Sequence, residues 1–144
     1  MPRHPVDVFF YGSYINFEVL AEVNILERPH QVAWLPGYKL VISPLANMVP
    51  DPSSTAFGMM TQLDHDELDR LYGEHARKRL GEIYLPEAVL VYTGANVMRP
   101  ALTYIAHDMA PARPAPDYVD RILRPAQGYG FPSDYLAYIE SFKP

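Results

Sequence analysis

The segment Val6-Asp7-Val8-Phe9-Phe10-Tyr11-Gly12-Ser13 decides the fold at the start of the chain. It is apolar at nearly every position except Asp7, which is the pattern of a strand buried on both faces. Gly12-Ser13 then ends the strand in a turn. A glycine lets the backbone approach a ligand closely, and successive N–H groups of such a turn can bind a carboxylate or a developing oxyanion. An ordinary strand-ending turn with Ser13 bonded locally is the simpler interpretation of these residues alone.

The composition is that of a globular protein. Of its 144 residues 49% are hydrophobic and 20% are charged, which predicts one domain over residues 1–144. The net charge is −5 without a run of like charge, so no nucleic-acid partner is expected. No apolar run approaches the ~20 residues of a membrane span, so no membrane partner is expected either. Cysteine is absent, which excludes disulfides and favours a cytoplasmic location.

Strand-like segments dominate the body of the chain. We expect a turn at Pro36-Gly37 between two short strands, and an irregular proline-rich loop at 43–54. Further strands are predicted at 55–63, 84–92 and 98–106, and helices after Asn16, from Asp117 to about Arg124 and from Pro132 to Phe142. Strands with helices between and after them predict an α+β fold.

The sharpest helix signal begins at Asp64. Asp64 stands at the N-cap position with Glu67 three residues later, which is the pattern of a capping box. Leu68 and Leu71 follow on one apolar stripe at helical spacing. Gly73 is a natural C-terminal stop, so the sequence predicts a short helix between Asp64 and Gly73.

Glu74 is the candidate acid–base residue. It follows Gly73, just beyond the negative end of the expected helix, where an ionised carboxylate is disfavoured if the side chain is also buried. A carboxylate in such a place suits a general base. The alternative is a surface glutamate in a charged loop, since His75 and several basic residues are close.

No metal or cofactor is expected. None of the histidines pairs with another histidine or a carboxylate at a ligand spacing. Ser13 has no nucleophile-elbow context, and the glycines do not form a phosphate loop.

Taken in order, these segments resemble the gamma-glutamylcyclotransferase family. The family opens with an aromatic strand that ends in Tyr-Gly-Ser, matched at 9–13, and continues with an aliphatic-Gly-aliphatic stretch, matched at 57–59. A Leu-Asp-x-x helix follows at 68–71, then a tyrosine that leads into a strand, Tyr84. Tyr118 comes after a proline-rich loop, and a Gly-x-Pro-x-x-Tyr element spans 130–135. The resemblance covers essentially the whole chain.

This resemblance implies a small mixed β-barrel with flanking short helices. It also implies an intramolecular reaction, in which the α-amine of a gamma-glutamyl compound attacks its own γ-carbonyl and releases 5-oxoproline and the attached amine or amino acid. Glu74 would serve as general acid and base, with no cofactor. The residues implied to bind the substrate are Tyr11, Gly12, Ser13, Tyr14, Tyr84 and Tyr118, and Tyr104 is expected in the same pocket.

Two positions depart from the family pattern. Many relatives have an acid in Leu-Asp-x-x-Glu-Gly, and here that place holds Tyr72. The nearest acid is Glu74, with Glu82 and Glu87 as fallbacks. Tyr14 follows Tyr-Gly-Ser where Asn or an aliphatic residue is more usual, so the pocket rim is altered. Two alternatives stay open: a non-catalytic small-molecule-binding or interaction module on the same fold, and an enzyme that removes a gamma-glutamyl protecting group from a larger metabolite.

Overall fold

The computed structural model describes residues 4–94 and 96–144. Among these residues, five strands form a closed barrel in the order β1-β3-β2-β4-β5. They are β1 (Val6–Phe10), β2 (His30–Ile42), β3 (Ala46–Leu63), β4 (Leu85–Thr93) and β5 (Val97–Ile105). Neighbouring strands are antiparallel except β1 and β5, which are parallel, so the barrel is mixed. The α+β barrel predicted from the sequence is confirmed.

The opening segment forms β1, as predicted. Phe9 and Phe10 are buried, and they pair with Met60 and Met59 of β3. The two strands cross so closely that a Cβ at Gly58 would lie 1.9 Å from the carbonyl oxygen of Phe10. Glycine is therefore required in the middle of β3, and this contact fixes where β1 ends and its turn begins.

Two predictions about the β2–β3 hairpin were wrong. Pro36-Gly37 is not a turn but a β-bulge inside β2, with Gly37 at φ +87°. A bulge takes up one left-handed residue while the strand continues. The expected loop at 43–54 is strand from Ala46 onward. Its prolines are tolerated because this part of β3 pairs with β2 alone and leaves its other edge free.

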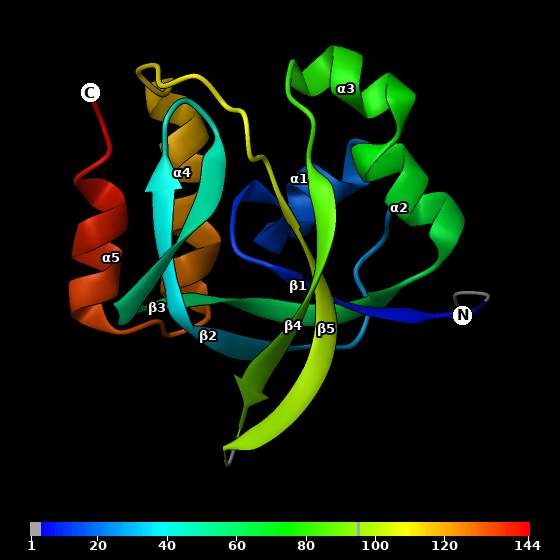
Figure 1. The fold of residues 1–144 in the computed structure, drawn as a ribbon, viewed down its shortest axis with the longest axis horizontal. Coiled ribbons are helices and arrows are strands. Elements are labelled where there is room, and N and C mark those ends of the chain that lie inside the picture. Colours follow the sequence, from blue (N-terminus) through cyan, green and yellow to red (C-terminus); the bar gives the residue numbers. More distant parts are fainter. Residues whose placement is uncertain (1–3, 95) are drawn as a thin grey trace.

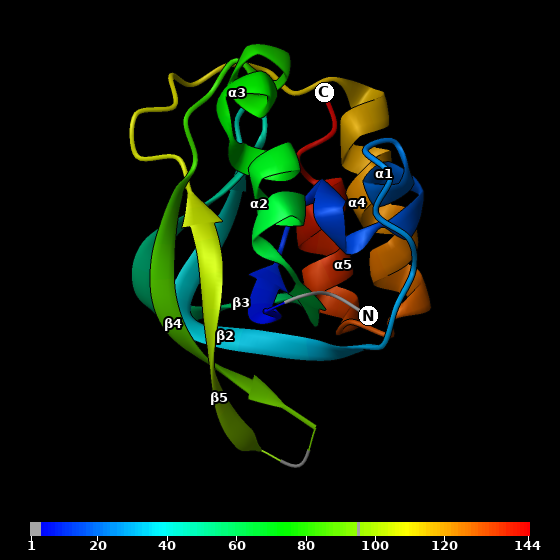
Figure 2. The ribbon, with the colours of Figure 1, turned by 90° about the vertical axis from the view of Figure 1, so that its right-hand side faces the viewer.

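The helices pack around the barrel in two groups (Figure 1). They are η1 (Ser13–Ile15), α1 (Phe17–Ala21), α2 (His65–Tyr72), α3 (Glu74–Leu80), α4 (Pro116–Gly128) and α5 (Ser133–Glu140). α4 and α5 lie side by side on one flank, while α2 and α3 lie above another part of the barrel (Figures 1 and 2). No helix in the described part of the chain is long and apolar enough to cross a membrane.

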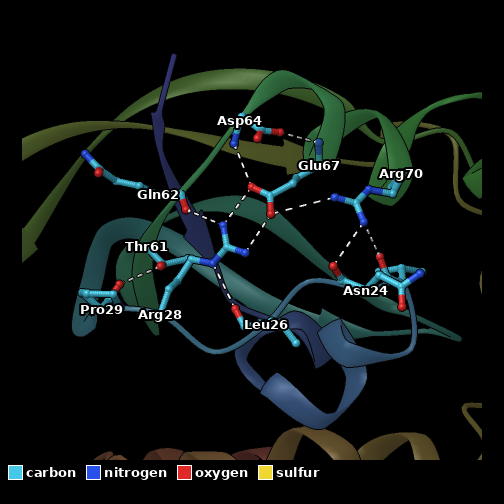
Figure 3. Close-up of polar contacts among 10 residues, drawn as sticks. Asn24, Leu26, Arg28, Pro29, Thr61, Gln62, Asp64, Glu67 and Arg70 are labelled. Carbon is cyan, nitrogen blue, oxygen red and sulfur yellow. Dashed lines mark hydrogen bonds and ion pairs between the residues drawn. The ribbon is translucent and has the colours of Figure 1, made fainter. Parts of the chain in front are cut away.

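The start of α2 is fixed by the predicted capping box (Figure 3). The Asp64 carboxylate accepts a hydrogen bond from the Glu67 N–H at 2.8 Å, and the Glu67 carboxylate accepts from the Asp64 N–H at 3.0 Å. Arg28 adds a two-pronged contact to the same Glu67 carboxylate at 2.8 and 2.7 Å. This contact is the main reason why the pKa of Glu67 is lowered. The segment before β2 is thereby tied to α2.

α2 ends at Gly73 as predicted, but the chain does not continue as a loop. A second short helix, α3, starts at once with Glu74. Gly73 is needed because a Cβ there would lie 2.5 Å from the carbonyl oxygen of Asp69, not because of a left-handed φ. The sequence did not reveal α3 because Ala76 is its only buried residue, so no apolar period marks it.

Candidate active site

A cavity of about 50 Å³ lies beneath the turn that follows β1. The turn, the start of β3, the end of α2 and the first turn of α4 all contribute to its wall. All the residues expected to bind the substrate are brought together here, although they lie far apart in the sequence. The lining residues are Phe10, Tyr11, Gly12, Ser13, Tyr14, Leu45, Ala46, Tyr72, Leu80, Tyr84 and Tyr118.

The turn itself is held against β3. A Cβ at Gly12 would lie 2.6 Å from the Cβ of Ala46, so only glycine fits at this position. The first hydrogen bond of the turn runs from the Ile15 N–H to the Gly12 carbonyl at 3.1 Å. The amides before it have no partner within the helical turn. Ser13 and Tyr14, whose N–H groups precede this bond, both line the cavity.

Tyrosine hydroxyls form the polar part of the wall. Tyr11 donates to the carbonyl oxygen of Tyr104 at 2.6 Å, and Tyr84 donates to that of Ala46 at 2.7 Å. The Tyr118 hydroxyl instead accepts a hydrogen bond from the Ala46 N–H at 2.9 Å. Because this bond uses the oxygen of Tyr118 as an acceptor, its hydroxyl hydrogen is left to donate.

These tyrosines are neutral at physiological pH. Burial raises the pKa of Tyr11, Tyr84 and Tyr118 above the usual tyrosine value. Burial also raises the pKa of Tyr72, and the neighbouring tyrosines raise it further. A neutral phenol donates a hydrogen bond to a carboxylate or carbonyl oxygen but does not take a proton from an ammonium group. Since the hydrogens of Tyr11 and Tyr84 already serve backbone carbonyls, Tyr118 is the wall hydroxyl that can donate to a polar group in the cavity.

Tyr72 occupies the place of the family acid. It is the last residue of α2, and its ring stacks on Tyr104 with centroids 3.8 Å apart and planes 9° from parallel. Tyr14 meets it edge-on at 5.6 Å, and the ring of Tyr84 lies tilted against it at 5.9 Å. Tyr104 does not line the cavity, contrary to expectation, but stands behind Tyr72. The sequence marked Tyr72 as a missing acid and did not identify it as part of the wall.

The structure does not bring Glu74 to the cavity. Glu74 is exposed and is absent from the lining. The prediction assumed a loop beyond the negative end of a helix, whereas Glu74 is the first residue of α3. Its exposed position lacks the burial on which the expected general base depended. The placement of Glu74 opposite the turn was wrong.

The two fallback acids lie elsewhere. Glu87 is in β4 and pairs with His107 at 2.9 Å, beside a different groove. Glu82 is half-buried between α3 and β4, and its charge adds to the burial that raises the pKa of Tyr84. Of the residues that the structure describes, no aspartate or glutamate lines the cavity. Within the same residues, no group of three or more His, Cys, Asp and Glu is placed to hold a metal ion.

The rim of the cavity is cationic. The Arg79 guanidinium donates to the Tyr14 hydroxyl at 3.2 Å, and Tyr14 in turn donates to the carbonyl oxygen of Leu71 at 3.4 Å. Burial raises the pKa of Tyr14, while the hydrogen bond and charge of Arg79 and the charge of Arg121 oppose that rise. Arg121 is itself paired with Glu22. Sequence reasoning had placed Arg79 in a solvated loop and so missed this contact.

No protein-family model and no curated protein sequence matches the chain. Solved structures do. A protein named gamma-glutamyl cyclotransferase has a TM-score of 0.82 at 20% identity, over 98% of this chain and 89% of its own. An uncharacterized protein from Homo sapiens has a TM-score of 0.81 at 20% identity, over 99% of this chain and 90% of its own. A yeast gamma-glutamyl cyclotransferase specific to glutathione has a TM-score of 0.67 at 10% identity, over 97% of this chain and 96% of its own. At these identities the likeness is one of fold, and the chain has the gamma-glutamyl cyclotransferase-like fold that its motifs predicted.

Proposed function

We propose that the chain binds a gamma-glutamyl compound in the tyrosine-lined cavity and does not cyclise it with a carboxylate base. One observation carries this proposal: Tyr72 fills the place of the family acid, and no carboxylate among the described residues lines the cavity. The ligand class is supported by the motif order and by the shared fold with proteins named gamma-glutamyl cyclotransferase.

Cyclisation needs a group that takes a proton from the substrate ammonium and later gives one to the leaving nitrogen. That group must lie within hydrogen-bonding reach, and it typically contributes about 10²- to 10⁴-fold to the rate. The tyrosines of the wall do not meet this need because burial keeps them protonated. The hydroxyl hydrogens of Tyr11 and Tyr84 already serve backbone carbonyls. Tyr118, whose hydroxyl accepts from Ala46, still has a hydrogen to donate to a carboxylate or carbonyl oxygen, so binding does not require a base.

The cavity accepts only one end of such a ligand. Its volume of about 50 Å³ has room for roughly four water-sized groups, since one water needs on the order of 10–15 Å³. A carboxylate or amide end therefore fits beneath the turn, with the aromatic rings packed on the adjacent methylene groups. The remainder of the ligand extends past the rim formed by Tyr14 and Leu80.

The test measures binding and turnover on the same preparation. Titration calorimetry with gamma-glutamylalanine should give saturable binding, and chromatography of the same mixtures after prolonged incubation should detect no 5-oxoproline above a protein-free blank. Tyr118→Phe removes the hydroxyl that is left to donate, so it should weaken binding. Release of 5-oxoproline at enzymatic rates would overturn the proposal, as would the absence of any binding.

A second candidate is a cyclotransferase with Glu82 as its base. It is supported by the location of Glu82, which is half-buried and stands two residues before Tyr84, a residue of the cavity wall. In that case the wild-type chain releases 5-oxoproline and Glu82→Gln loses the activity. Glu74→Gln is the matched control, since Glu74 is exposed and outside the cavity. Equal activity in all three proteins would remove Glu82 from consideration.

A further inference from the structure

We propose that Arg79 binds a second negative group of the ligand at the rim, so that the site selects gamma-glutamyl amino acids over gamma-glutamyl amines. This inference rests on the proposed function and names its ligand class more narrowly. A gamma-glutamyl amino acid carries a carboxylate on the side that leaves the cavity, whereas a gamma-glutamyl amine carries none there.

The position of Arg79 comes from α3. Its neighbour Leu80 lines the cavity, and its own guanidinium donates to the hydroxyl of Tyr14, another lining residue, at 3.2 Å. The cation is therefore one side chain away from the cavity interior. A guanidinium has five N–H donors, and the contact with Tyr14 uses one of them. The others remain available for a carboxylate, to which arginine binds with two parallel hydrogen bonds.

The charge of Arg79 is not compensated by the protein. Within the described part of the chain, Arg79 has no ion-pair partner, whereas Arg28, Arg70, Arg99 and Arg121 each contact an acidic side chain. Arg77 and Lys78 precede it on the same helix and are also unpaired among these residues. The rim is thus locally positive in a chain whose net charge is −5.

A simpler explanation covers part of this pattern. Cations in the last turn of a helix stabilise it through the helix dipole, and Arg77, Lys78 and Arg79 all lie there. The dipole accounts for their charge but not for the contact of Arg79 with a tyrosine of the cavity wall. Arg77 shares the helix, the charge and the exposure, but among the described residues its side chain makes no hydrogen bond to the wall. It therefore serves as the matched control.

The ligand is larger than the cavity, so its two ends meet different parts of the protein. Since the cavity holds only one end of the ligand, the leaving side lies outside it. Of the lining residues, Tyr14 is bonded to Arg79 and Leu80 is its neighbour in the chain. A carboxylate on that side comes within reach of the Arg79 guanidinium. Because Arg79 is exposed, the contact is screened, and we expect a preference of about two- to fivefold.

The experiment compares gamma-glutamylglycine with gamma-glutamylethylamide, which differ at one carboxylate. Calorimetry at pH 7 and low salt should show that the wild-type chain binds gamma-glutamylglycine about two- to fivefold more tightly. Arg79→Gln should abolish this preference by weakening gamma-glutamylglycine alone, and Arg77→Gln should retain it. Raising the salt from about 0.05 to 0.5 M should shrink the preference, because the ion pair lies in solvent.

Each other outcome overturns the inference in a distinguishable way. Equal affinity of the wild-type chain for both compounds removes the role of Arg79 and leaves the proposed function standing. If Arg77→Gln and Arg79→Gln lose the preference for gamma-glutamylglycine equally, the preference comes from the summed positive charge of α3 and not from a contact with Arg79. Weaker binding of both compounds to Arg79→Gln assigns the residue to the support of Tyr14. Binding of neither compound to the wild-type chain overturns this inference and the proposed function together.

Discussion

Replacing Tyr72 with glutamate should create cyclotransferase activity in this chain. Tyr72 ends α2 at the cavity wall, in the place where the family motif has its acid. The helix is held there by its capping box and by Arg28, neither of which involves Tyr72. A carboxylate introduced by Tyr72→Glu would therefore enter the cavity without moving α2.

The cost in stability can be worked from the contacts that are lost. The stack of Tyr72 on Tyr104, with centroids 3.8 Å apart, contributes about 0.5–1.5 kcal/mol beyond burial. Loss of a large aromatic side chain to a smaller one brings the total to about 3 kcal/mol. A domain with a typical stability of about 5–15 kcal/mol remains folded after this loss. The gain is the acid–base contribution of about 10²- to 10⁴-fold in rate.

The pH dependence follows from the same surroundings. Burial raises the pKa of the Tyr72 hydroxyl because it disfavours the charged form. It should raise the pKa of a carboxyl placed there for the same reason. A general base acts when it is deprotonated, so the activity of Tyr72→Glu should rise with pH through this raised pKa.

The assay is release of 5-oxoproline from gamma-glutamylalanine, followed across pH 5–9. Tyr72→Gln is the matched control, since glutamine has the size of glutamate but cannot take the proton. We expect activity in Tyr72→Glu and none above background in Tyr72→Gln. If both variants are folded and equally inactive, the position of residue 72 does not decide the chemistry, and the argument from the cavity lining fails.

Two further predictions concern the frame of the site. Gly12→Ala should cost about 1–3 kcal/mol of unfolding free energy, because its Cβ would lie 2.6 Å from that of Ala46. Chemical denaturation should show the loss, whereas Gly128→Ala, with open space around it, should be neutral or better. Glu67→Gln should cost about 2 kcal/mol at pH 7, since it leaves Arg28 without its carboxylate. The pKa of Glu67 is lowered in the folded chain, so the stability that its charge contributes is present above about pH 4.5 and is lost as the pH falls through the pKa of the folded state. Equal unfolding free energies of wild type and Glu67→Gln at neutral pH would refute this prediction.

The sequence predicted the parts of the fold that short-range chemistry decides. The strand before Gly12 and the capping box of Asp64 and Glu67 are read from neighbouring residues alone, and both are confirmed. The prediction of a turn at Pro36-Gly37 was wrong because a strand paired with a neighbour can continue through proline and glycine by forming a bulge. α3 was missed because its stability comes from tertiary contacts, with Ala76 as its buried residue.

The difference between short-range and tertiary effects also explains why the wall of the cavity was predicted from the sequence and the position of the base was not. Most of the residues expected to bind the substrate lie in the turn after β1 or just before β4, and Tyr118 lies in the first turn of α4. The barrel and the helix packed on it bring them together. The base depended on whether the chain after Gly73 was a loop or a helix, and the start of α3 turned Glu74 toward solvent. One missed helix therefore changed the predicted chemistry while leaving the predicted fold intact.

The contacts that hold α2 in place do not involve the residue that α2 presents to the cavity. Asp64, Glu67 and Arg28 act at the start of the helix, and the identity of the residue at its end does not enter those contacts. A barrel of this kind can therefore keep its shape with either an acid or a tyrosine at position 72. Likeness of fold to proteins named gamma-glutamyl cyclotransferase consequently carries the barrel frame to this chain and no particular chemistry. Under the function proposed above, the side chain at position 72 and its neighbours in the wall decide whether the cavity cyclises its ligand.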